Sequence, residues 1–125
     1  MGVLLVGYAM SEIRTARIQY THLGWEDHGL FTLCIGLDYG SGAQGFGHLI
    51  LSNYDKATDR QVGTAYGMDL IMRICAVVGV NTWEELKGKH CRTDADYSKI
   101  HRLGNLLKDN WLDPAALFAS SAPRA

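Results

Sequence analysis

The chain has 125 residues, of which 47% are hydrophobic and 20% are charged, and its net charge is near −1. This length can bury a hydrophobic core without disulfide or metal staples, and the composition is that of a globular protein rather than a disordered one. The near-neutral charge excludes the broad basic surface by which proteins bind duplex nucleic acid, so any anion site must be local.

The cysteines and the N-terminal residues indicate the cellular compartment of the protein. The chain has three cysteines, Cys34, Cys75 and Cys91, and no C-x-x-C pair. An odd number without such a pair argues against a disulfide framework and favours a reducing compartment. We expect the three to be small buried apolar residues. The N-terminal apolar run lacks a basic flank and is too short to span a bilayer. We expect a cytoplasmic protein that contacts no membrane. Residues 1–10 are expected to be a leader or an artificial extension, residues 11–119 one domain, and residues 120–125 a frayed tail.

Three strands are predicted in the first half of the chain. Residues 13–21 mix β-branched and aromatic residues, residues 30–38 are the most apolar and suit a central strand, and residues 46–51 are its hairpin partner. Four glycines within eight positions, 40 to 47, fit a tight connection between antiparallel strands. The segments before and after, residues 22–29 and 52–60, are expected to be loops.

A long helix is predicted after Gly63-Thr64, ending at Gly79. Apolar residues at spacings of three and four give it one face, and further apolar residues widen that face until little is polar except Asp69 and Arg73. We therefore expect a helix that is buried on nearly all sides, against the sheet or in a subunit interface. The first set is Met68, Ile71, Met72, Cys75 and Val78, and the second is Leu70, Ile74 and Val77.

Short elements are expected in the last third of the chain. Thr82 and Glu85 form a capping box for a short helix. Residues 89–93 are predicted to be a strand, and residues 100–107 are ambiguous between strand and helix, a strand broken at its glycine being favoured. Asp113-Pro114 is typical of the N-cap and first position of a final helix.

These elements predict the fold class α+β. We expect a small antiparallel sheet with a central hairpin, one long buried helix and short C-terminal helices, in a homo-oligomer.

The clearest local charge lies between residues 87 and 102. Alternation along a strand places His90 and Arg92 on one face, and a guanidinium beside an imidazole suits a phosphate or diphosphate. The alternative is a solvated basic edge, which many sheets carry. The cationic or titratable residues of this segment are Lys87, Lys89, His90, Arg92, Lys99, His101 and Arg102, against Asp94 and Asp96.

Other chemistry has weaker signals. The helix start at residues 63–67 could attract an anion, although the P-loop pattern is absent. The His and acidic residues of the segment 22–28 match neither zinc nor EF-hand spacing, and no nucleophile has an obvious base, so no metal, cofactor or catalytic group is expected. Trp111 is expected in the core, between Leu107 and Leu112.

Six motifs together resemble the Thoeris anti-defence sponge family of small proteins from tailed phages and prophages, over residues 11 to 118. The resemblance implies a non-enzymatic protein of the infected bacterial cytoplasm that sequesters, without cleaving, the cyclic ADP-ribose-like signal of TIR-domain enzymes, or a cyclic oligonucleotide. The motifs are RTARI at 14–18, LGWEDHG at 23–29, LDYG at 37–40, QGFG at 44–47, GVNTWEELKG at 79–88 and WLDP at 111–114.

The resemblance assigns no binding residue position by position, but a sponge is compatible with the charged segment. Its cations would hold the phosphates, residues 93–98 would close as a lid, and two apolar helix residues would form a floor beneath a base. The ligand would lie between subunits of a dimer or larger oligomer. The expected ligand-binding residues are Met68, Ile71, Lys89, His90, Arg92, His101 and Arg102.

Two other functions fit the same sequence. A protein–protein inhibitor, of the anti-CRISPR or host-takeover kind, would use the basic edge to occupy a nucleic-acid channel or would bury an apolar patch on a host enzyme. The third hypothesis is an enzyme that cleaves the cyclic nucleotide signal.

Overall fold

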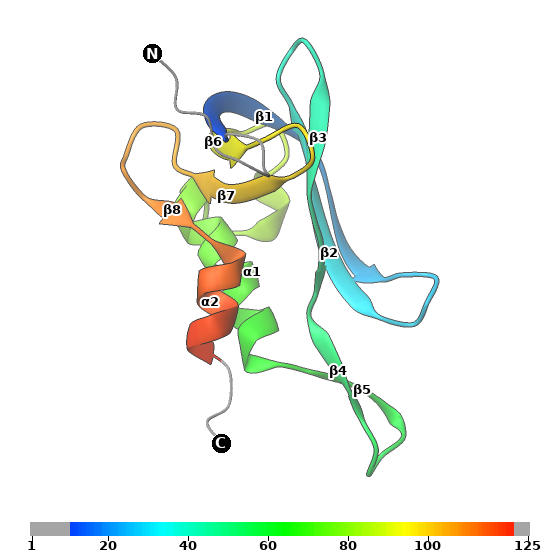
Figure 1. Cartoon of the computed structure of the whole chain (residues 1–125). Helices are drawn as coiled ribbons and strands as arrows, with labels where there is room; N and C mark the ends of the chain where they lie inside the picture. The colour runs from blue at the N-terminus through cyan, green and yellow to red at the C-terminus, as the bar shows by residue number, and fades with distance from the viewer. Residues whose placement is uncertain (1–10, 122–125) are drawn as a thin grey trace, which may run out of the picture.

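Eight strands, two α-helices and a short 3-10 helix make up residues 11–121, the part of the chain that this computed structural model describes (Figure 1). The fold class is α+β, as predicted. In chain order the elements are β1 (Glu12–Trp25), β2 (Phe31–Asp38), β3 (Ala43–Ile50), β4 (Ser52–Asp55), β5 (Arg60–Gly63), α1 (Ala65–Val78), η1 (Trp83–Glu85), β6 (His90–Ala95), β7 (Ile100–Gly104), β8 (Trp111–Leu112) and α2 (Pro114–Ser121).

Six strands form an antiparallel sheet in the order β3-β2-β1-β6-β7-β8. The long β1 pairs with β6 along its first half and with β2 along its second half. The sheet curls, so that its edge strand β3 comes close to β7. Among the described residues, no backbone ladder joins these two strands. The curl therefore leaves a gap between β3 and β7.

The core lies between the curled sheet and α1. Gly67 brings the helix against the chain after β3, because a Cβ at this position would lie 2.6 Å from the Leu51 carbonyl oxygen. Leu70, Ile74 and Val77 follow on the same helix face and are buried. The sheet contributes the buried side chains Ala16, Ile18, Leu33, Ile35, Leu37, Phe46, Cys91, Ala95, Ile100, Leu103 and Leu112.

The fold of a single chain does not bury α1 on nearly all sides, and burial in a subunit interface stays a prediction. Met68 is 58% exposed and Met72 is 60% exposed. The core covers only one stripe of α1. This stripe begins at Gly67 and contains the second predicted apolar set, Leu70, Ile74 and Val77. The first set lies at the edge of the contact, with Ile71 packed against the core and both methionines in solvent.

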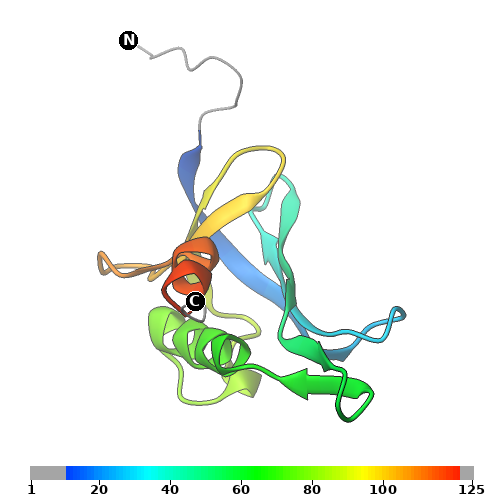
Figure 2. The same cartoon turned by 60° about the horizontal axis from the view of Figure 1, so that its bottom comes forward.

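Two predicted loops are hairpins, in which strand residues flank the short turns at residues 26–30 and 56–59. β1 continues to Trp25, where it pairs with Phe31 and the two rings pack edge to face at 5.1 Å. Residues 52–60 belong to the hairpin β4–β5, whose turn is held by Asp55 through the Ala57 amide and the Thr58 hydroxyl. Both hairpins project away from the helices (Figures 1 and 2). The β4–β5 segment resembles a loop in the sequence because its strand residues are mostly polar and exposed.

The local signals at helix ends are confirmed. The Thr64 hydroxyl accepts the Gly67 amide at 2.9 Å, and Gly79 ends α1 with a φ of 94°. The capping box of Thr82 and Glu85 is present, although the helix it starts is a single 3-10 turn. Asp113 caps α2, as expected.

The cysteines are free thiols. Cys34 and Cys91 are buried, as predicted, whereas Cys75 on α1 is partly exposed. Burial raises the pKa of the Cys91 thiol to about 12, so this residue is an unreactive part of the core.

Two further sequence predictions concern the ends of the chain and membrane contact. The expected leader, residues 1–10, and residues 122–125 of the expected tail lie outside the described residues; α2 runs to Ser121. Neither described helix has the length and apolar character of a membrane-spanning segment.

Candidate functional site

Arg102 and Arg92, predicted to bind an anion, are engaged within the fold. Arg102 Nε and Nη2 each lie 2.8 Å from Asp94 Oδ2 on the neighbouring strand. Arg92 Nε donates to the Asn105 carbonyl and Nη2 to the Lys108 carbonyl, both at 2.8 Å. These donors therefore hold β6, β7 and the β7–β8 loop together.

Trp111 is the second partner of both arginines. It is half-buried on the outer face of the sheet rather than in the core, with the guanidinium carbons of Arg92 and Arg102 at 4.9 and 4.6 Å from its ring centroid. The ring lies over Gly104, where a Cβ would come within 2.6 Å of it. The prediction failed because the stacking residues are distant in the sequence.

The remaining predicted site residues are dispersed. Lys89 and His90 are exposed at the start of β6, and Met68 and Ile71 lie on α1. The predicted lid begins inside β6, where Thr93 is fully buried, so only residues 96–99 form a turn. Of the seven predicted ligand-binding residues, His101 alone lines the groove described next.

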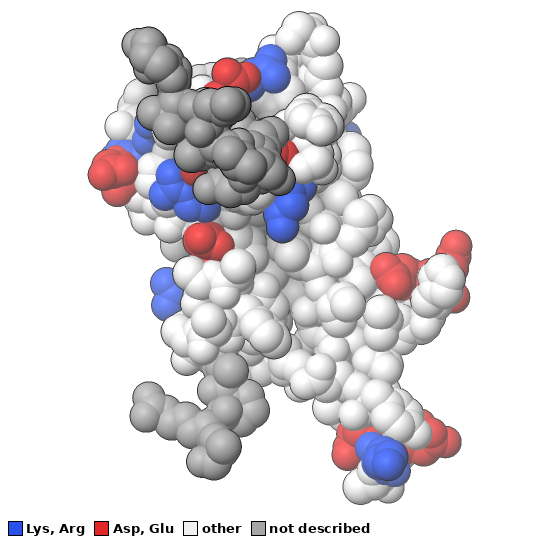
Figure 3. Space-filling model, viewed as in Figure 1, with Lys and Arg blue, Asp and Glu red and all other residues white. Residues whose placement is uncertain are grey.

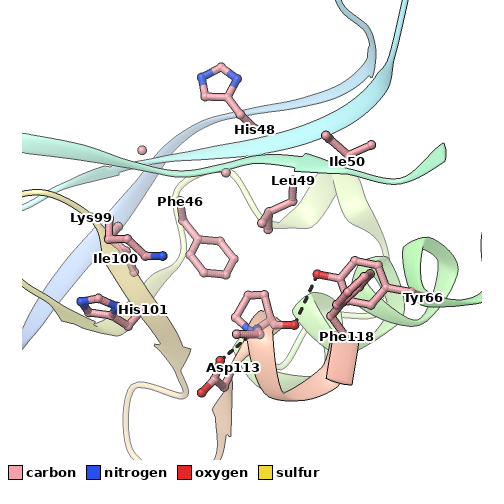
Figure 4. Close-up of a pocket in the computed structure, with 14 residues that line it drawn as sticks. Phe46, His48, Leu49, Ile50, Tyr66, Lys99, Ile100, His101, Asp113 and Phe118 are labelled. Carbon is pink, nitrogen blue, oxygen red and sulfur yellow. Dashed lines mark hydrogen bonds between the residues drawn. The ribbon is translucent and has the colours of Figure 1, made fainter. Parts of the chain in front are cut away.

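A groove of about 640 Å³ occupies the gap between β3 and β7 (Figure 4). One wall is β3 from Gly45 to Ile50, and the opposite wall is Lys99 to His101 at the start of β7. The N-terminal turn of α2 and Tyr66 of α1 complete it. The surface over the middle of this face carries few charged side chains, which gather mainly at the hairpin tips and the upper end (Figure 3).

A β-bulge at Gly47–His48 shapes the first wall. Cys34 pairs with Gly47 and the adjacent Leu33 pairs with Leu49, so His48 is an extra residue, with the left-handed φ of 56°. Phe46 and Leu49 consequently point into the groove, whereas the side chain of His48 points away from it (Figure 4). A Cβ at Gly47 would lie 2.4 Å from the Cα of Cys34, which requires glycine there.

The opposite wall is organised by Asp96. Its Oδ1 accepts hydrogen bonds from the Ser98 amide and hydroxyl and from the Lys99 amide, and its Oδ2 lies 2.8 Å from His101 Nε2. The bonds from Ser98 and then from His101 hold the pKa of the Asp96 carboxyl well below its usual range. An ionised Asp96 thus fixes one ring nitrogen of His101 and leaves Nδ1 for a ligand.

Aromatic rings and one carboxylate line the lower end. Tyr66 and Phe118 pack edge to face at 5.1 Å, and the Tyr66 hydroxyl donates to the Pro114 carbonyl at 3.4 Å. Burial, followed by the Asp113 carboxylate, raises the pKa of Tyr66. Phe118 remains 59% exposed and presents its ring at the mouth.

The upper end of the gap is closed by a polar network. The Tyr39 hydroxyl donates to Gln44 Oε1 at 2.6 Å, and Gln44 Nε2 donates to the Asp96 carbonyl at 2.8 Å. Arg14 stacks on the Tyr39 ring at 4.0 Å and borders a second hollow of about 330 Å³ on the far side of this network.

Sequence reasoning missed most of the groove. Lys99 appeared only among the charged residues of its segment, and Asp113 only as a helix cap. Tyr66 lies in the weakly indicated anion site at residues 63–67, whereas Phe46 and Phe118 were not among the expected ligand-binding residues. The usable signal was the pattern Gly45-x-Gly47, since a glycine inside a strand commonly marks a bulge or a close approach. Nothing in the sequence placed β3 opposite β7.

Neither a cluster of metal ligands nor a known relative indicates what the groove binds. Within residues 11–121, no three His, Cys, Asp or Glu side chains gather as they would around a metal ion. Comparison of the chain with protein-family models, with curated proteins and with solved structures finds no match. What the groove binds must therefore follow from its own chemistry.

Proposed function

We propose that this protein captures a phosphate-bearing cyclic nucleotide signal of the cyclic ADP-ribose type in the β3–β7 groove and holds it without cleaving it. It would act as a phage anti-defence sponge in the cytoplasm of the infected host, as its resemblance to the Thoeris anti-defence family implies. One observation carries the proposal. The groove has two cationic or protonatable side chains, Lys99 and His101, on one wall and three aromatic rings on the others.

The dimensions and chemistry of the groove suit such a ligand. Small-molecule sites commonly have volumes of about 300–1,000 Å³ and apolar walls with a few placed polar groups. The Lys99 ammonium would donate to phosphate oxygens, and so would Nδ1–H of His101 in its imidazolium form, whose Nε2–H is held by Asp96. Phe118 and Tyr66 offer a surface for a base, and stacking of a base on an aromatic ring contributes roughly 1–3 kcal/mol.

Capture without turnover is sufficient for this role, because a sponge lowers the free signal by mass action. The cleavage alternative has one specific observation in its favour, the Asp96–His101 pair, in which a carboxylate orients an imidazole as in general-base sites. Recovery of the intact ligand separates the two.

We also propose that the protein self-associates through the exposed face of α1. Met68 and Met72 lie one turn apart there, with the partly exposed Cys75 on the next turn. A second copy is one way to cover this apolar stripe.

The experiment mixes the purified protein with cyclic ADP-ribose, removes unbound ligand, denatures the protein by heat and identifies the released molecule by mass spectrometry. Release of intact ligand by the wild type, its loss in Lys99→Ala and its retention in Lys56→Ala support the proposal. Lys56 is an exposed lysine of the β4–β5 turn, outside the groove, and is a charge-matched control. A hydrolysed product indicates an enzyme, and equal retention by both variants removes the groove from the function.

A protein–protein inhibitor is the second candidate, because large apolar side chains are exposed on both projecting hairpins. Trp25 on β1 is 59% exposed and Tyr54 on β4 is 56% exposed. An inhibitor would lose its effect on the host enzyme in Trp25→Ser and keep it in Lys99→Ala. A sponge would show the reverse.

A further inference from the structure

Asp113 is the one carboxylate among the described residues that line the groove. Its Oδ1 accepts the Ala115 amide at 3.0 Å and the Ala116 amide at 3.3 Å, so this oxygen caps α2. Within residues 11–121, Oδ2 accepts no hydrogen bond. The carboxylate borders the lower end of the groove, below Phe46 and on the same side as His101 (Figure 4).

The groove is therefore electrostatically mixed. A purely anionic ligand such as inorganic diphosphate would gain from Lys99 and His101 but would be repelled by Asp113, because like charges in a half-enclosed site repel strongly. A ligand that carries a hydroxyl or amino donor next to its phosphate satisfies both the cations and Asp113. A nucleoside phosphate is such a ligand, since its ribose and base supply the donors.

We infer that Asp113 is a specificity-determining residue that accepts a hydrogen bond from a ribose hydroxyl or base amino group and so selects nucleoside phosphates against inorganic polyphosphate. The inference rests on the proposed function of the groove. It assigns the α2 cap a second role, because Oδ1 caps the helix while the residue also lines the groove.

Asp113→Asn isolates the second role. Asparagine is as good an N-cap as aspartate, so α2 keeps its cap while the groove loses its negative charge. The matched control is Asp27→Asn, which makes the same change at the exposed β1–β2 turn. Circular dichroism and thermal unfolding establish that both variants fold as the wild type does.

Calorimetry then measures the affinity of each protein for cyclic ADP-ribose and, in separate titrations, for inorganic diphosphate. We expect Asp113→Asn to weaken cyclic ADP-ribose by about tenfold or more, as for loss of a hydrogen bond to a charged group, and to tighten diphosphate. Asp27→Asn should change neither. The opposite signs are diagnostic, because a distorted groove would weaken both probes.

The outcomes separate the two claims. Wild-type protein that binds no cyclic ADP-ribose overturns the proposed function and the role of Asp113 with it. Wild-type binding that Asp113→Asn leaves unchanged, or a parallel loss of both probes, overturns the role of Asp113 alone.

Discussion

Gln44 donates a hydrogen bond from Nε2 to the backbone carbonyl of Asp96 at 2.8 Å, and this bond ties the edge strand β3 to the β6–β7 turn. Gln44 Oε1 also accepts the Tyr39 hydroxyl, which lies 3.1 Å from Thr93 Oγ1 on β6, so both side chains link the β2–β3 hairpin to β6 and its following turn. The upper end of the groove is thus fixed by the side chains of Gln44 and Tyr39 rather than by a backbone ladder.

Gln44→Ala should loosen this closure. We expect the free energy of unfolding to fall by about 1–2 kcal/mol, since the hydrogen bonds of Gln44 with the Asp96 carbonyl and the Tyr39 hydroxyl are both lost. Urea denaturation followed by fluorescence measures the change, with the exposed Gln19→Ala as control. Equal stability of the two variants would contradict a closing role for Gln44.

Arg102→Ala should change stability rather than ligand capture. Its half-exposed ion pair with Asp94 and its contact with Trp111 together contribute about 1 kcal/mol. Thermal unfolding should therefore occur at lower temperature, while the protein still retains cyclic ADP-ribose in calorimetry. Loss of binding without loss of stability would return this residue to the binding site.

Met68→Asp should separate self-association from folding. The side chain is 58% exposed, so a charge there costs the folded chain little but would be buried in an α1-mediated interface. We expect an unchanged circular dichroism spectrum and a smaller sedimentation coefficient.

The control on the opposite face of α1 is Leu70→Ala, which should lower stability by about 2–5 kcal/mol because Leu70 is fully buried. An identical sedimentation profile for Met68→Asp and wild type would exclude α1 as the interface.

Acid should weaken the β6–β7 turn through Asp96. The pKa of this carboxyl is lower in the folded chain than the value of about 3.9 in an unfolded chain. Its stabilisation is therefore fully present above about pH 4 and is lost as the pH falls through the lower folded value. Asp96→Asn should flatten the acid limb of the free energy of unfolding against pH. An unaltered acid limb would show that Asp96 does not contribute.

The sequence predicted the features that depend on neighbouring residues. Gly79 and Asp113 were correctly assigned as caps, and the start of α1 after Thr64 was correctly placed, because these signals involve backbone groups within a few positions. The fold class and the β2–β3 hairpin followed from composition and glycine spacing.

Features that depend on residues far apart in the sequence were not predictable in the same way. Helical periodicity gives two apolar stripes on α1, and only the approach of Gly67 to Leu51 decides which of them is covered. In the candidate site, an excess of cations in one segment could not reveal that Asp94 on β6 faces Arg102 on β7. Both errors arise from pairing that only the folded sheet creates.

The extra residue in β3 has a consequence for how the groove could vary. Removing His48 would restore the regular alternation of the strand and leave Phe46 and Leu49 on the same side, because the two residues flank the insertion. It would also remove the local twist that a bulge adds, so β3 would run straighter past β7. The spacing between the two walls therefore depends on the length of β3 at position 48 more than on the side chain found there.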